Sequence, residues 1–141
     1  MLEELIVPEG LVSIPNERYA GNPVLRKVVL PQSLRELGVA AFAECRSLES
    51  VDIPKGLLRI RKEAFSGCES LRSIEIPASV TSIGEWAFRG CTNLESVSVP
   101  ASVVDICAES FLGCPNLTLH VTKDSFAASY AEMFGIRFDI V

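Results

Sequence analysis

Aromatic residues recur along this chain at a fixed interval of 23 residues, as the positions Tyr19, Phe42, Phe65, Phe88 and Phe111 show. A leucine series and a proline series keep the same interval: Leu2, Leu25, Leu48, Leu71, Leu94 and Leu117, and Pro8, Pro31, Pro54, Pro77 and Pro100. Tandem units of about 20 to 29 residues built on leucine form solenoids, in which each unit stacks on its neighbours. The interval therefore predicts a repeat solenoid, mainly of β structure.

Each unit has the pattern of a short strand followed by a turn. In the fourth unit, Ile74 and Ile76 alternate with polar residues, and a period of two indicates a strand with one buried face. Pro77 has no N–H group for a ladder, so the strand should end near it. Val80 and Ile83 supply a second inward-pointing pair. Stacked units should thus form two parallel β walls.

Two further positions of the unit concern its turns and its core. Gly38 and Gly84 share one position, where we expect a turn with a positive φ angle. Next to it, Ala87 places a small residue beside the ring of Phe88. We expect the aromatic rings of successive units to stack into a continuous spine.

The pattern LxxIxIPxxVxxIGxxAFxGC resembles the leucine-rich repeat of the bacterial surface-protein type, the BspA or Treponema class. The resemblance covers five units, at residues 2–24, 25–47, 48–70, 71–93 and 94–116. It implies a right-handed superhelix with parallel β walls. It also implies a secreted or cell-surface protein associated with adhesion and host contact.

The interval breaks after Leu117, where one residue is missing. Asp124 is then suited to cap a helix, aromatic residues follow at helical spacing, and Gly135 stands where the helix would end. The segment from Ile136 to Ile140 alternates as a closing strand. We therefore expect residues 117–141 to form a helix-plus-strand cap on a single domain, 1–141.

Composition limits the partners of this domain. The chain is 48% hydrophobic with a net charge of −5, which disfavours nucleic acid and anionic membranes as partners. No apolar run reaches the ~18 residues of a membrane span, and the N-terminus does not have the pattern of a signal peptide. We expect a monomer without a cofactor. The chain could be a segment of a longer protein or a small protein whose first unit is its own cap.

Cys45, Cys68, Cys91 and Cys114 share one position, which Asn22 occupies in the first unit. Stacked coils would bring these thiols to about 5 Å from one another, a distance that raises the question of disulfides. Side chains on a regular stack point the same way, however, so we expect buried, reduced thiols. Cys107 replaces the turn glycine and should be the one reactive candidate.

The sequence does not predict an enzyme. His120 is the single histidine, and a Cys–His pair would need it beside Cys107 or Cys114 together with an orienting group. Cysteines 23 residues apart lack the close spacing of zinc ligand pairs. We therefore assign no catalytic, metal or cofactor site.

Surface positions remain as candidates for binding. The outward residues of the strands form one row of Glu4, Lys27, Ser50, Ser73 and Ser96, and a second row of Ile6, Val29, Asp52, Glu75 and Ser98. The candidate ligand-binding residues are Ser50, Asp52, Ser73, Glu75, Ser96 and Ser98, although serine and carboxylate also serve simply for solubility. Trp86 is a further candidate, because other units place glutamate or alanine at its position. Alternatively, its ring covers the stems of Lys62 or Arg89.

Three classes of function are open. The first is a binding module that recognises a protein or a glycan through a face of the solenoid. The second is a structural spacer with no ligand of its own. The third, an enzyme, is the least favoured.

Overall fold

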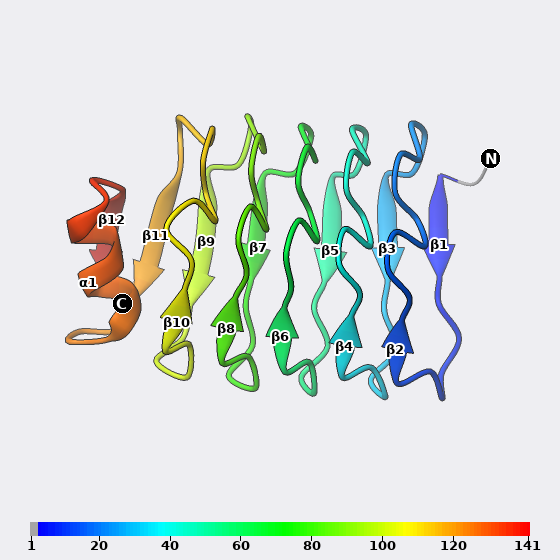
Figure 1. Cartoon of the computed structure of the whole chain (residues 1–141), viewed down its shortest axis with the longest axis horizontal. Coiled ribbons are helices and arrows are strands. Elements are labelled where there is room, and N and C mark those ends of the chain that lie inside the picture. Colours follow the sequence, from blue (N-terminus) through cyan, green and yellow to red (C-terminus); the bar gives the residue numbers. More distant parts are fainter. Residues whose placement is uncertain (1–2) are drawn as a thin grey trace.

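The structure, a computed structural model, describes residues 3–141 as a β solenoid with two walls (Figure 1). The first wall contains β1 (Glu4–Ile6), β3 (Lys27–Val29), β5 (Ser50–Asp52), β7 (Ser73–Glu75), β9 (Ser96–Val99), β11 (Thr118–Val121) and β12 (Arg137–Ile140). The second wall contains β2 (Ser13–Ile14), β4 (Glu36–Leu37), β6 (Arg59–Ile60), β8 (Ser82–Ile83) and β10 (Asp105–Ile106). The single helix of the described residues, α1 (Phe126–Met133), lies with β12 at the C-terminal end. Leu2, the first leucine of the series, lies outside the described residues.

All strand pairs of both walls are parallel, as the repeat predicts. Lys27 of β3 faces Ser50 of β5, a step of 23 residues along the chain. Thr118 of β11 faces Ser96 of β9, a step of 22 residues. The missing residue is therefore lost between Leu117 and the start of β11, and β11 continues the wall of the preceding coils.

Aromatic rings stack along the interior, as predicted from their interval. The centroids of the rings from Tyr19 to Phe111 are 5.3–5.8 Å apart, with interplanar angles of 2–16°. Tyr130 of α1 continues the stack at 6.3 Å from Phe111, tilted by 59°. Its hydroxyl lies 3.1 Å from the carbonyl of Cys107 and 3.0 Å from that of Ala108. The cap is thereby joined to the spine and to the last coil.

The predicted reason for Gly38 and Gly84 is wrong. Neither has a positive φ angle. Within the repeat, the glycines just before the cysteine position have one instead, such as Gly67 and Gly90, with φ of 75° and 71°. At Gly84, an added Cβ would lie 2.6 Å from the backbone nitrogen of Lys62. Glycine is needed there because two neighbouring coils approach closely, not because of the local turn.

The start of the capping helix also differs from its prediction. Ser125, not Asp124, is the N-cap, since its hydroxyl accepts a hydrogen bond from Ala128 N at 3.2 Å. Asp124 adopts a φ of 60°, so its backbone still belongs to the turn. The end agrees with expectation, because Gly135 follows the helix with a φ of 67°.

The cysteines are free thiols, and three members of the ladder, Cys45, Cys68 and Cys91, are buried. Each ladder thiol donates to the carbonyl of a spine aromatic in the previous coil, at 3.1–3.3 Å. Cys114 is only half-buried, contrary to expectation, because it belongs to the last full coil and has no following repeat over it. Asn22 replaces the thiol by accepting bonds from Val24 N and Leu25 N.

Candidate functional site

The outward side chains of the first wall lie in the two predicted rows. The strand register places Glu4, Lys27 and Ser50 side by side, followed on the next sheet by Ser73 and Ser96. The second row runs from Ile6 to Ser98 in the same way, and all of its side chains are exposed or half-buried. The six candidate residues of the strands are therefore brought onto one face.

This wall is interrupted in its middle. Its strands form a three-stranded sheet, β1-β3-β5, and a four-stranded sheet, β7-β9-β11-β12. Within residues 3–141, no backbone hydrogen bond joins β5 to β7, although the two strands are neighbours. At other steps the residue just before the strand donates to its counterpart in the previous coil, for example Glu49 N to Arg26 O at 2.8 Å. Arg72 N has no such bond to Glu49. We call this break the β5–β7 seam.

Two carboxylates face each other at the seam. Continuing the register across it would pair Asp52 with Glu75, the single step of this row in residues 3–141 at which two acidic residues are adjacent. Like charges on directly opposite residues oppose strand pairing, and interactions between exposed charges are worth roughly 0.2–1 kcal/mol. Neither side chain makes an ion pair within the described residues. The seam thus coincides with the one like-charge step of this row.

A groove of about 730 Å³ lies over the seam. Its lining includes Ser50, Asp52, Ser73 and Glu75, with the apolar side chains of the two strands between them. Lys55 and Ser79 also line it. Among the described residues, Ser79 Oγ is the one buried side-chain oxygen without a hydrogen-bond partner. The groove therefore combines unpaired charges, hydroxyl groups and an apolar floor.

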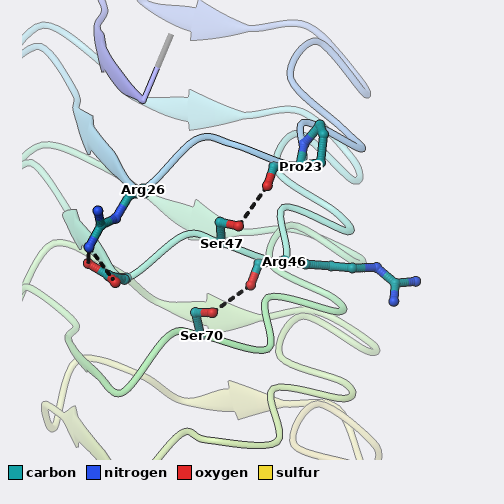
Figure 2. Close-up of polar contacts among 6 residues, drawn as sticks. Pro23, Arg26, Arg46, Ser47 and Ser70 are labelled. Atoms are coloured by element: carbon teal, nitrogen blue, oxygen red, sulfur yellow. Dashed lines mark hydrogen bonds and ion pairs between the residues drawn. The ribbon is translucent and has the colours of Figure 1, made fainter. Parts of the chain in front are cut away.

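The loops that lead into the seam are held together by polar contacts. Figure 2 shows Ser47 Oγ donating to Pro23 O at 2.6 Å and Ser70 Oγ donating to Arg46 O at 2.7 Å. The ion pair of Arg26 with Glu49, at 3.0 Å, lies beside them. Because the Ser70 contact spans the coils that carry β5 and β7, the coils stay joined at one end of the seam.

Trp86 is already engaged within the chain. Its ring lies 5.2 Å from Lys62 Nζ and 5.1 Å from Arg89 Cζ, and its Nε1 donates to Glu109 Oε1 at 3.1 Å. The side chain is half-buried and its backbone has a φ of 59°. These contacts favour the second interpretation of Trp86, a ring that covers neighbouring side chains.

His120 does not contact either cysteine considered for it. Its Nε2 lies 2.8 Å from Ser96 Oγ and its Nδ1 lies 2.6 Å from Asp139 Oδ1. Sequence reasoning missed this cluster, because it depends on the parallel pairing of β11 with β12. The alternation of Ile136, Phe138 and Ile140 indicated a strand, but nothing in it indicated its neighbour.

Comparison with known proteins gives the family. The BspA type leucine rich repeat region matches residues 1–134 in six copies. The chain belongs to the BspA-type leucine-rich repeat family. Its mainly-β solenoid and its C-terminal helix agree with the fold expected from the repeat pattern.

Solved structures of bacterial leucine-rich repeat proteins superpose on the structure of this chain. A leucine rich cell surface protein from Faecalibacterium prausnitzii A2-165 has a TM-score of 0.85 and 29% identity over 92% of the chain. The Treponema pallidum leucine-rich repeat protein has a TM-score of 0.81 and 34% identity over 84% of the chain. One from Bacteroides ovatus ATCC 8483 has a TM-score of 0.78 and 31% identity over 84%. The chain spans 34%, 58% and 33% of their respective lengths.

No curated protein sequence matches the chain. Within the described residues, the one helix is too short to cross a bilayer.

Proposed function

We propose that this BspA-type domain is a non-enzymatic binding module of a secreted or cell-surface bacterial protein. It binds a protein or glycan partner through the groove over the β5–β7 seam. The proposal rests on one observation: two carboxylates without an ion-pair partner among the described residues, Asp52 and Glu75, lie in a groove of about 730 Å³. The surface location rests on the description of the Faecalibacterium relative as a cell surface protein.

The lining of the groove defines the chemistry of its ligand. Asp52 and Glu75 accept hydrogen bonds and attract positive charge, so they favour a lysine, an arginine or an amino sugar. Ser50 and Ser73 are exposed hydroxyls that suit the polar groups of a peptide backbone or a sugar. We therefore favour a ligand that carries a basic group over a neutral glycan.

The test is binding of the parent protein and two variants to peptide and glycan arrays. In the groove variant, Asp52→Lys/Glu75→Lys, both carboxylates become positive. We expect this variant to lose the ligand, and we expect binding to the parent to weaken as salt rises, because exposed charges are screened.

A charge-matched control is Asp105→Lys/Glu132→Lys, which changes two exposed carboxylates away from the groove by the same net charge. It should bind like the parent, as should Trp86→Ala. Equal binding by the parent and the groove variant would contradict the proposed site. Absence of any ligand for the parent would favour the structural spacer.

A further inference from the structure

Three side chains from three adjacent strands form a hydrogen-bonded chain at the C-terminal end of the first wall. Ser96 belongs to β9, His120 to β11 and Asp139 to β12. His120 lies opposite both Ser98 and Asp139 in the register, yet its ring bonds the diagonal neighbour Ser96 rather than Ser98. The distances are 2.8 Å from Ser96 Oγ to Nε2 and 2.6 Å from Nδ1 to Asp139 Oδ1.

The direction of these bonds follows from the groups that make them. An ionised carboxylate only accepts hydrogen bonds. In the neutral ring, Nδ1 therefore carries the proton and donates a hydrogen bond to Asp139. Nε2 is then the acceptor, and the hydroxyl of Ser96 donates to it. The proton of Ser96 therefore points at a base, which is the arrangement that activates a serine hydroxyl as a nucleophile.

The cluster is accessible from solvent. Ser96 is half-buried, and the side chains of His120 and Asp139 are 27% and 56% exposed. Both neighbours of β11 are paired with it along four residues, so its backbone N–H groups lie within ladders. The strand surface therefore offers few free donors for a developing oxyanion, which restricts the chemistry to acyl donors with a good leaving group.

We propose that Ser96 is an acyl-acceptor site for activated esters or thioesters. Ser96 Oγ attacks the carbonyl carbon and its proton passes to His120 Nε2. The bond to the leaving group breaks, the departing oxygen or sulfur takes that proton, and the acyl group stays on Ser96. Asp139 holds the ring in the tautomer that accepts the proton. This chemistry modifies the protein once and is independent of ligand binding at the seam.

The experiment treats the full chain with 4-nitrophenyl acetate and locates the acetyl groups by mass spectrometry. Ser73 is the internal control, because it occupies the same row without a histidine beside it and is more exposed than Ser96. We expect Ser96 to be acetylated about 100-fold faster than Ser73, at the lower end of the effect of a general base. Equal rates, or acetyl groups on lysines and cysteines alone, would overturn the proposal.

Variants separate activation from simple exposure. In Asp139→Asn, the new amide can donate a hydrogen bond to Nδ1, so the proton of the ring moves to Nε2. Nε2 can then no longer accept the proton of Ser96, and acetylation of Ser96 should fall to the rate of Ser73. His120→Gln should do the same. Ser98→Ala, which alters the residue directly opposite His120, should leave the rate unchanged. Circular dichroism of each variant checks that the fold is retained, and full acetylation in a folded Asp139→Asn would contradict the assigned role.

Discussion

At the scale of single residues, the cysteine ladder shows how one position of the repeat changes its properties along the stack. Burial raises the pKa of the Cys68 and Cys91 thiols well above the ordinary value. It raises the pKa of Cys114 from 9.0 to about 11, in part offset by a backbone hydrogen bond. Since the thiolate is the reactive form, raised pKa values and burial both slow reaction at neutral pH.

Thiol labelling of the native protein should therefore separate the five cysteines into a fast-reacting and a slow-reacting group. We expect Cys107 and Cys114, the two half-buried thiols, to react with iodoacetamide first, and Cys45, Cys68 and Cys91 to react only after denaturant is added. A Cys107→Ser/Cys114→Ser variant should show no early labelling. Early modification of Cys91 in the folded parent would show that the thiols of the ladder are accessible to solvent, and would contradict their burial.

The same pKa shift predicts how stability depends on pH. The pKa of Cys114 is higher in the folded chain than in the unfolded chain, so its contribution to stability is complete below pH 9.0. It should be lost as the pH rises from 9.0 through about 11. Urea unfolding across this range should show a smaller loss of stability for Cys114→Ala than for the parent.

At the scale of secondary-structure elements, strand pairing along the wall depends on which outward residues come side by side. Val29 beside Asp52 is compatible with pairing, and Glu75 beside Ser98 is too, whereas Asp52 beside Glu75 coincides with the seam. The second wall is continuous across the same coils, from β2 to β10. The seam is therefore local to one face, and the core beneath it remains stacked.

Hydrogen exchange measured by NMR tests this account. In the parent, the amide of Arg72 should exchange about tenfold faster or more than that of Glu95, which donates to Arg72 O at 2.8 Å. Glu75→Gln removes the like charge, so it should slow exchange at Arg72 and raise the free energy of unfolding by about 0.2–1 kcal/mol, the range for exposed charge pairs. Glu132→Gln on α1 is the control and should do neither. Equal protection of the Arg72 and Glu95 amides in the parent would show that the seam is closed in solution.

At the scale of the whole molecule, stability is distributed along a stack in which each coil contacts its neighbours. The aromatic spine passes through every full coil and ends on Tyr130 of the cap. Phe88 is fully buried, with rings at 5.6 Å and 5.3 Å on its two sides. Loss of one ring in the middle of this stack leaves a cavity that neither neighbour can fill without moving its own coil.

Phe88→Ala should accordingly destabilise the protein by about 3–5 kcal/mol, as measured by urea unfolding. Phe126→Ala is the matched control: this residue of α1 is 42% exposed and lies outside the spine, so its loss of stability should be clearly smaller than that of Phe88→Ala. If Phe88→Ala unfolded at the same urea concentration as the parent, the spine would not be a main source of stability.

The 23-residue interval determined the solenoid, its parallel walls and its aromatic spine, because these depend on the spacing of like residues along the chain. The period of two within each strand likewise determined that Ser50, Asp52, Ser73 and Glu75 face outward. These properties are local or strictly periodic, so they can be predicted from a single sequence.

Contacts between coils were decided only by the tertiary structure. The approach of the coils at Gly84 and the β5–β7 seam each depend on atoms from different units. The choice of Ser125 rather than Asp124 as the cap depends on the local backbone, since Asp124 has a φ of 60°. The hydrogen-bonded chain through His120 depends on a step of 22 residues and on the pairing of β12 with β11. The physical reason is that hydrogen bonds and close contacts depend on distances of a few ångströms between residues about 20 positions apart. Where the repeat is interrupted, its pattern does not specify these distances.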